Sequence, residues 1–467
     1  SSQPLKNIQT DNTAGNTPAV QMQTVPLQLD TLTIASGTTW DANDFDLTVM
    51  GDFTNDGTFS PGQNSTYFSG TVAQSLSGTG TTEFYNFYKN ASNTLSLGSD
   101  ITVSNEFHLL SGILADQGNE IAVSGNLYID GTHDWGDAGR GIRVAGNEPQ
   151  IMQATGTLGK IHIDNPEGVS VPTESIAITV TDAIQFNQGV FDIGKNLLVM
   201  GQNAEFIEES AYSENNMVQT NMSFTDNGIK KIFPEITSAA SYTFPLGSQG
   251  KYTPIDLNIT AINSGGSIRT KPADEKQSTV TDDNDECNEF DDTQNVLQYH
   301  WVLDAEGITN FSADITMHYL EEDAIVNNTH GYGLSDYITA RLLLNETEWN
   351  KYDAGSFDEN NHKMHFSFSG ADNQGISGEY TAGIEQETGC NGAIPNEVPM
   401  YITVQNGNWT DAGTWETYPD GDPGPAGGPR GAIAIVEHEV DINNNYKLNY
   451  KTEINGKLNV YSTFGHR

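Results

Sequence analysis

The chain has 467 residues, of which 62 are Asp or Glu and 20 are Lys or Arg, and its formal net charge at pH 7 is −42. An acidic surface of this size repels phosphate backbones and anionic lipid, so we expect no nucleic-acid partner. No apolar run is long enough to span a bilayer, so we expect no direct membrane insertion. The charge suits solubility in salty water, or a surface that carries divalent cations.

The first stretch, residues 1–29, is polar and rich in Gln, Asn and Thr, with prolines at Pro4, Pro18 and Pro26. We interpret it as a linker or the end of a preceding module. Residues 1–20 lack the basic start and apolar core of a signal peptide, so an export signal is not visible. We expect the chain to be part of something longer.

One pattern recurs within residues 47–201. The phrases Leu47–Gly51, Ile121–Gly125 and Leu197–Gly201 match, and they follow one another at a nearly constant interval. The text between them also matches, because Gly70 with Gln74 recurs as Gly146 with Gln150. A fixed period indicates stacked units, each of which depends on its neighbours to bury its apolar face.

The units of this repeat are predicted to be β-strands. Segments such as Thr31–Ile34, Lys160–Asp164 and Ile176–Val180 alternate apolar and polar residues, which is the period of a half-buried strand. Gly, Asn, Asp and Ser fall between the runs, because these residues accept turn conformations. At roughly 20–25 residues per coil, a period of about 75 residues predicts about three coils per repeat. We therefore predict an all-β chain with a parallel β-solenoid over residues 30–235.

The character of the sequence changes from about Ser241. Short strands such as Tyr252–Leu257 and Ala313–Tyr319 are separated by loops of irregular length. Strands of this kind over residues 236–386 predict an antiparallel β-sandwich. Trp301 stands among apolar neighbours and is the predicted core anchor of this sandwich.

A connector and a third module follow. Residues 387–398 contain Gly and Pro and are predicted to be a connector. Beyond it, Tyr401–Val404, Ile433–Val436 and Leu458–Val460 have the pattern of short strands again. We predict that residues 399–467 are the start of another β-solenoid module.

Cys287 and Cys390 are the two cysteines of the chain. In an exported protein such a pair indicates one disulfide, which closes a loop of about 100 residues and stabilises by about 4–5 kcal/mol in the chain-entropy model. The alternative is two unpaired thiols in a reducing compartment. We favour the disulfide, because an acidic, lysine-poor, turn-rich chain is typical of extracellular proteins.

Several phrases carry a resemblance to known proteins. Asn408–Trp409 followed by Thr414–Trp415, a Pro/Gly loop and Ile435–Val436 is similar to a module opening in large surface proteins of Bacteroidota. Gln74–Gly78 resembles the β-solenoid repeats of the same proteins, and Tyr242–Gly247 resembles their sandwich modules. The resemblance implies an extracellular fibre or adhesin segment at the cell surface, of the kind exported by type IX secretion.

The same resemblance implies one modification. Asp30, Thr31 and Leu32 resemble the O-glycosylation sequon of Bacteroidota, which is an acidic residue, then Ser or Thr, then an apolar residue. Thr31 is therefore a candidate glycosylation site. An unmodified threonine is the alternative, because the match is so short.

An acidic segment is the candidate metal site. Its seven closely spaced carboxylates repel one another unless cations screen them, and oxygen ligands in a flexible loop suit Ca²⁺. The spacing differs from the EF-hand pattern, and a solvated loop with diffuse counterions is the alternative. The candidate ligands are Asp282, Asp283, Asp285, Glu286, Glu289, Asp291 and Asp292.

Catalytic motifs are otherwise absent from the sequence, including nucleophile elbows, P-loops and zinc-binding cysteine pairs. Some parallel β-helices are polysaccharide lyases or hydrolases that place carboxylates on one face. The loop Asp130–Asp137 with Arg140 is the candidate of this kind, because it would bring His133, Asp134 and Asp137 together. Gly- and Asp-rich loops are equally typical of any solenoid turn. We therefore expect no enzyme.

The sequence and the resemblance together predict a stalk or fibre segment of an adhesin used for attachment, gliding or prey capture. Expected partners are surface glycans or other cells, and assembly into a homo-oligomeric fibre is a further expectation. The alternative is a secreted carbohydrate-binding or polysaccharide-degrading β-helix protein. Exposed aromatic residues along one face would favour sugar binding, whereas two carboxylates about 5–10 Å apart in a groove would favour catalysis.

Overall fold

The computed structural model describes most of the chain. The described residues are 5–11, 19–136, 140–172, 176–221, 223–280, 295–326, 332–344, 346–371, 373–385, 393–425, 427–429, 431–443, 446–449, 451–461 and 464–466. They divide into two compact units, one of residues 1–221 and 226–232 and one of residues 222–225 and 233–467. The predicted all-β class is confirmed, because strands dominate both units.

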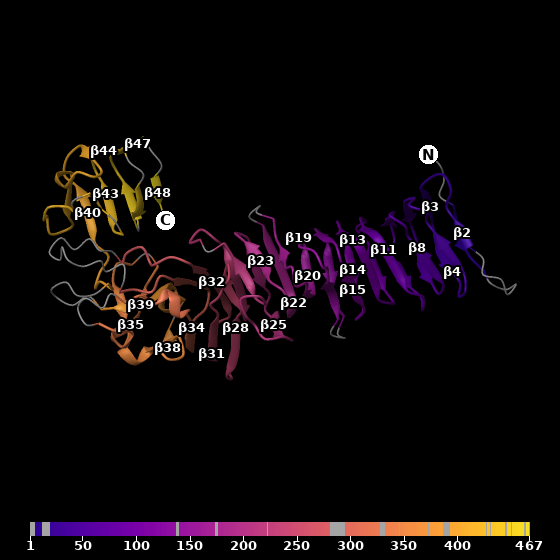
Figure 1. Cartoon of the computed structure of the whole chain (residues 1–467), viewed down its shortest axis with the longest axis horizontal. Coiled ribbons are helices and arrows are strands. Elements are labelled where there is room, and N and C mark those ends of the chain that lie inside the picture. The colour runs from indigo at the N-terminus through magenta and orange to yellow at the C-terminus, as the bar shows by residue number, and fades with distance from the viewer. Residues whose placement is uncertain are drawn as a thin grey trace. The chain divides into compact units, whose positions relative to one another are not determined.

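The first unit is a parallel β-solenoid, which Figure 1 shows as a stack of short strands. The strand pairings give three strands per coil, one on each of three faces. The first face carries β2 (Ala19–Gln21), β5 (Thr39–Asp41), β8 (Thr58–Ser60), β15 (Glu120–Val123), β18 (Gly141–Val144) and β25 (Glu205–Glu208). The second face carries β3 (Leu27–Leu29), β6 (Leu47–Val49), β9 (Ser65–Phe68), β16 (Asn126–Ile129), β19 (Gln150–Ala154), β21 (Val169–Ser170), β23 (Phe191–Gly194) and β26 (Val218–Thr220).

The third face carries β1 (Ile8–Gln9), β4 (Leu32–Ile34), β7 (Phe53–Asn55), β10 (Gln74–Ser77), β12 (Thr94–Leu97), β14 (Ile113–Ala115), β17 (Thr132–Asp134), β24 (Leu197–Met200) and β27 (Gly228–Phe233). Longer strands turn a corner and contribute to two faces. They are β11 (Thr82–Lys89), β13 (Ile101–Leu109), β20 (Thr157–Asp164) and β22 (Ala177–Gln188).

The solenoid core is built from in-register columns of apolar side chains. On the first face, Ile101 pairs with Ile121, Ile121 with Ile142, and Ile142 with Ile161. The length of each of these coils is therefore near the lower limit of the expected range, roughly 20 residues. All four isoleucines are at most 2% exposed. Because neighbours along each strand alternate between inside and outside, every coil adds one layer to the same continuous core.

The sequence repeat does not correspond to a whole number of coils. Among the described residues, β15 is the eleventh strand segment after β6 and β24 is the eleventh after β15, with each corner-turning strand counted as two. At three segments per coil, one repeat is three and two-thirds coils, rather than the expected three. The matching phrases Leu47–Gly51, Ile121–Gly125 and Leu197–Gly201 therefore lie on the second, first and third faces respectively.

A buried glutamine closes the equivalent corner in both copies of the repeat. Gln74 accepts a hydrogen bond from the N–H of Gly70 at 3.0 Å and donates to the carbonyls of Val49 and Gly51. Gln150 does the same with the equivalent residues of the next copy, Gly146, Val123 and Gly125. Each amide thus accepts one backbone N–H and donates to two carbonyls, and the carbonyl of Val49 or Val123 among them also accepts a backbone N–H from the next coil.

Two buried lysines also donate hydrogen bonds to backbone carbonyls. Lys89 is fully buried and donates to the carbonyls of Ala91 and Ser111. Lys231 donates to the carbonyl of Gly201 at 2.8 Å and to two further carbonyls in the same turn. Burial lowers the pKa of each amine to about 8.

The interpretation of residues 1–29 as a linker is wrong for the part that the structure describes. Ile8 pairs with Leu32, Ala19 with Thr39, and Leu27 with Leu47, all in parallel ladders. The polar composition misled the prediction, because a solenoid coil shares a thin core with its neighbours and needs few apolar residues of its own.

The second unit begins with an antiparallel β-sandwich, as predicted. One sheet has the order β28 (Ala240–Phe244), β31 (Ile255–Ala261), β34 (Phe311–His318), β38 (Lys363–Ala371) and β37 (Phe357–Asp358). The other joins β32 (Gly266–Ala273), β33 (His300–Glu306), β39 (Gly378–Ile384), β35 (Tyr337–Leu342) and β36 (Trp349–Lys351). The smaller elements are β29 (Leu246–Ser248), β30 (Lys251–Tyr252), η2 (Glu321–Asp323), η4 (Leu334–Asp336), η5 (Ala354–Ser356) and α1 (Asn373–Ile376). Trp301 is fully buried, and its indole N–H donates to the carbonyl of Thr253.

The second unit also contains the predicted start of another solenoid. Met400 pairs with Ile433, and Ile433 pairs with Lys451, so the first coil, which includes the Pro/Gly loop, is much longer than the second. Trp409 and Trp415 fill its core with ring centroids 4.8 Å apart. Its elements are β40 (Met400–Thr403), β41 (Gly407–Asn408), η6 (Ala412–Thr414), β42 (Trp415–Thr417), β43 (Ile433–Val436), β44 (Glu439–Ile442), β45 (Tyr446–Asn449), β46 (Lys451–Ile454), β47 (Lys457–Val460) and β48 (Phe464–His466).

Candidate functional site: a groove on the second face of the solenoid

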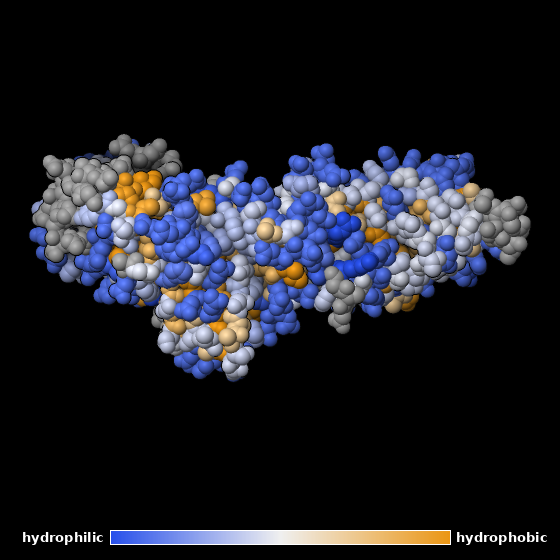
Figure 2. Space-filling model, turned by 60° about the horizontal axis from the view of Figure 1, so that its bottom comes forward, coloured by the Kyte–Doolittle hydropathy of each residue, from blue (hydrophilic) through white to orange (hydrophobic). Residues whose placement is uncertain are grey.

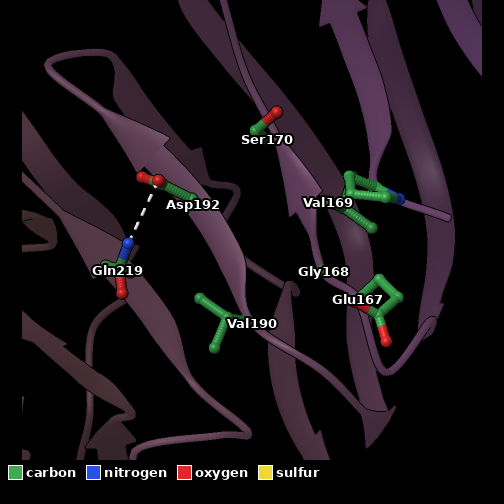
Figure 3. Close-up of a pocket in the computed structure, with 8 residues that line it drawn as sticks. Glu167, Gly168, Val169, Ser170, Val190, Asp192 and Gln219 are labelled. Carbon is green, nitrogen blue, oxygen red and sulfur yellow. Dashed lines mark hydrogen bonds between the residues drawn. The ribbon is translucent and has the colours of Figure 1, made fainter. Parts of the chain in front are cut away.

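A groove of about 190 Å³ opens on the second face of the solenoid, between β21 and β26 (Figure 3). The face of the molecule shown in Figure 2 is mainly hydrophilic, with small separate hydrophobic patches. The residues that line the groove are Pro149, Glu167, Gly168, Val169, Ser170, Val190, Asp192 and Gln219.

The coil register places the polar residues of the groove side by side. Ser170 pairs with Ile151 on one side and with Asp192 on the other, and Asp192 pairs with Gln219. All four face outward, because they alternate with buried neighbours on their strands. The short side chain of Ser170 lies between longer ones, which produces the hollow.

A glycine turn forms one wall of the groove. Gly168 has a φ of +85°, and its N–H donates to the carbonyl of Asn165 at 3.0 Å. A residue with a β-carbon is strained in this conformation, so glycine is needed where the chain turns into β21. The turn exposes the carboxylate of Glu167 beside the groove.

The central carboxylate is held in a defined orientation. Asp192 Oδ2 accepts a hydrogen bond from Gln219 Nε2 at 3.0 Å, and Oδ1 accepts one from the N–H of Gly194 at 2.9 Å. Figure 3 shows the amide oxygen of Gln219 pointing away from Asp192, and the side chain of Val190 between Gln219 and Glu167. The groove therefore presents fixed oxygen acceptors around an apolar side chain.

These groups suit a ligand rich in hydroxyl donors. Carboxylate and amide oxygens accept hydrogen bonds from hydroxyls, while Val190 and Pro149 offer apolar contact to C–H groups. An anionic ligand is disfavoured, because Glu167 and Asp192 both carry negative charge. The volume is below the roughly 300–1,000 Å³ of typical drug-sized sites, so a single sugar ring is the appropriate scale.

The second face also carries a stack of aromatic rings. Tyr67, Tyr88, His108 and Tyr128 lie in register on successive coils, with ring centroids 4.2–4.7 Å apart. Aromatic residues along one face were the feature expected to favour sugar binding. Here each ring covers the face of its neighbour, so the inner rings present only their edges to solvent. The stack ties coils together rather than forming a flat platform for a sugar.

The structure separates the residues of the predicted catalytic loop. His133 is buried and bonded to Asp116 at 2.9 Å, whereas Asp134 is exposed on the outer surface. Arg140 pairs with Asp100. Asp137 lies outside the described residues, and those that are described do not converge on one point.

Of the other predicted site residues, the structure describes only Thr31. Thr31 is half-buried before β4, and its carbonyl accepts the N–H of Ile8. Cys287, Cys390 and the acidic segment 282–292 lie outside the described residues. Within the residues that the structure describes, no group of three or more His, Cys, Asp or Glu side chains could hold a metal ion.

Sequence reasoning missed the groove, because Ser170, Asp192 and Gln219 are far apart in the sequence and belong to no motif. The coil register is the signal that would have found them. A search based on this signal looks for polar residues that occupy the same outward position on successive coils. It requires the coil register, and the sequence repeat did not reveal this register because one repeat is three and two-thirds coils.

Comparisons of the chain with family models, with curated proteins and with solved structures found no match. Within the described part of the chain, no helix has the length and apolar character needed to cross a membrane.

Proposed function

We propose that the chain is a structural and adhesive segment of a bacterial surface protein, in which the solenoid is a stiff stalk and the groove binds a glycan. The observation that supports the stalk is the continuous coil stack. Backbone ladders and apolar columns join each coil to the next, and the aromatic stack joins four successive coils. Load along such a stack is shared by many short ladders, each of which is a nearest-neighbour interface.

The proposed location of the chain is extracellular. The net charge of −42 suits a solvated surface structure, and the resemblance to Bacteroidota surface proteins adds type IX secretion and display on the cell. Ca²⁺ bound by the segment 282–292 would screen its carboxylates. Side-by-side or end-to-end assembly would add multivalent adhesion.

Electron microscopy of the producing cells, labelled with an antibody to residues 236–386, tests the location. Label along extended surface filaments is the expected result. Diffuse label, or recovery of the protein as compact particles in the medium, would contradict a surface stalk.

The glycan contact is tested separately on a glycan array. Ser170→Trp fills the groove, and we expect it to reduce binding at least tenfold, whereas Ser75→Trp on the third face is the matched control. Equal binding by both variants would remove the groove from the proposal. It would leave the stalk untouched.

Cleavage of a polysaccharide in the same groove is the second candidate function, because Glu167 and Asp192 are two carboxylates in one hollow. Incubation with bacterial and algal polysaccharides, followed by a reducing-end assay, distinguishes it from binding. Products that disappear in Asp192→Asn would establish an enzyme, and binding without products would exclude one.

A further inference from the structure

One charged cluster of the sandwich contains a lysine between two aspartates. Lys251 begins β30, Asp274 follows directly after β32, and Asp323 ends η2. Lys251 Nζ lies 2.6 Å from Asp274 Oδ1 and 2.6 Å from Asp323 Oδ1. One amine is thus in contact with two carboxyl groups that come from different parts of the chain.

The cluster is largely shielded from water. The side chain of Asp323 is 5% exposed, that of Lys251 is 17% exposed and that of Asp274 is 21% exposed. The ring of the fully buried Tyr299 lies beneath the amine, with its centroid 5.6 Å from Nζ. The hydroxyl of Tyr299 contacts Thr253 and Ser248, which fixes the ring.

The hydrogen bonding of Asp323 is incomplete. Its Oδ2 is buried and has no hydrogen-bond partner among the residues that the structure describes. A buried acceptor without a donor destabilises the folded state, and it does so more strongly if it is charged. The ion pair with Lys251 therefore leaves one buried oxygen of Asp323 without a hydrogen bond.

The charges of the cluster favour a neutral acid at this position. Burial raises the pKa of Asp323, although the hydrogen bond from Lys251 opposes the shift. For Lys251, burial lowers the pKa, but hydrogen bonds to Asp274 and Asp323 outweigh it and raise it. The state with the least buried charge is an ion pair of Lys251 with Asp274 beside a protonated Asp323.

We propose that Lys251 and Asp323 condense into an intramolecular isopeptide bond, with Asp274 as the proton carrier. This inference is independent of the proposed function, because it rests on the cluster alone. An amine held against a carboxylic acid has a very high effective concentration, and this favours a reaction that is slow between free groups.

The reaction balances without a cofactor. Asp274 takes one proton from the ammonium group, and the neutral Nζ attacks Cγ of the protonated Asp323 to form the C–N bond. The C–O bond to the hydroxyl of Asp323 breaks, and this hydroxyl leaves as water with a second proton of the amine. The third proton stays on the amide nitrogen, and no atom is oxidised or reduced.

The product would change the sandwich in two ways. It removes a buried positive charge and gives Asp323 a neutral amide oxygen. It also joins residues 72 positions apart by a covalent bond, so the segment between β30 and η2 becomes a closed loop. A closed loop cannot be extended by force until a covalent bond breaks, which suits a stalk.

The mass of the intact chain tests the proposal. After reduction and denaturation, we expect the 467-residue chain to be lighter than its sequence by one water molecule. Trypsin should fail to cleave after Lys251, and a branched peptide should link Lys251 to Asp323. A full-mass chain that is folded by circular dichroism would overturn the proposal.

Three variants complete the test. Lys251→Arg and Asp323→Ala should have the full sequence mass, and Lys251→Arg keeps the positive charge, so it controls for the ion pair. Asp274→Ala should also have the full mass while it remains folded. Water loss that persists in Lys251→Arg would overturn the cross-link, and a cross-link in Asp274→Ala would overturn the role of Asp274.

Discussion

Several buried polar side chains of the solenoid bond to the backbone, whereas two buried pairs of the sandwich bond side chain to side chain. In the solenoid, Gln74, Gln150 and Lys89 bond to backbone carbonyls or N–H groups. In the sandwich, Lys251 pairs with Asp323 and Gln277 with Glu379, so side chains bond to one another. Parallel coils leave backbone groups unpaired wherever a corner interrupts the ladder, whereas the long antiparallel ladders of the sandwich pair most of theirs.

This contrast predicts how far the effect of a substitution extends. Gln74 and Gln150 belong to one repeated corner, so the effect of a substitution there should recur at the equivalent corner. In the sandwich, each buried pair occurs once and joins segments that are distant in sequence, so its effect is individual.

Phe84→Ala should have the largest effect. Phe84 is fully buried and contacts the rings of Phe53, Phe59 and Phe68, with centroids 5.6–6.0 Å away. Removing the ring should lower the free energy of unfolding of the solenoid by about 3–5 kcal/mol. Denaturant unfolding measures it, with the outward-facing Tyr85→Ala as control, and equal losses in both variants would contradict the core assignment.

Gln74→Leu and Gln150→Leu should destabilise the solenoid by similar amounts. Each change leaves the N–H of Gly70 or Gly146 without its acceptor and removes the side-chain donor from two carbonyls, of which Val49 or Val123 keeps a backbone donor, at a cost of about 2–4 kcal/mol. Urea unfolding curves of the two variants should therefore superimpose. Gln63→Leu at an exposed position is the control. A large difference in stability between Gln74→Leu and Gln150→Leu would contradict the expectation that equivalent corners on different faces contribute equally to stability.

Lys89→Met should remove part of a pH dependence. Burial lowers the pKa of Lys89 to about 8, while in the unfolded chain the amine keeps the ordinary, higher lysine pKa. The unfolded chain therefore binds more protons above pH 8, and the stability of the wild type should rise with pH from about 8 to the ordinary lysine range. Lys231 has the same shift, so Lys89→Met should keep about half of the rise.

Thermal unfolding at pH 7 and pH 10 measures this rise. In the double variant of Lys89→Met with Lys231→Met, the rise between the two pH values should be lost. The same pH dependence in the wild type and in the double variant would contradict the assignment, because both lysines would then bind protons equally in the folded and unfolded states.

Arg143→Met should have the smallest effect. Arg143 lies on β18 and bridges Glu120 on the preceding coil, at 3.1 Å, and Asp164 on the following coil, at 3.2 Å. Its side chain is 32% exposed, so solvent screens both pairs and the loss should be about 0.5–1 kcal/mol. The difference from the wild type should shrink in 1 M salt, and a loss that is independent of salt would indicate packing instead of charge.

Much of the fold could be predicted because its causes are local. Alternation in segments such as Ile176–Val180, and turn residues such as Gly168, depend on neighbours in the chain. The number of coils per repeat could not be predicted, because it depends on how many residues each corner takes. The same reason led to the wrong interpretation of residues 1–29, whose pairing partners lie one coil away.

The pattern of the sequence was enough to predict the all-β class and the solenoid with its sandwich and second solenoid. Which side chains meet depends on the tertiary structure. Ser170, Asp192 and Gln219 share a groove because coil register aligns them, and Lys251 meets Asp323 from a distant part of the chain. Alternation and charge are read along the chain, whereas a site depends on register and closure between distant segments, which no local pattern encodes.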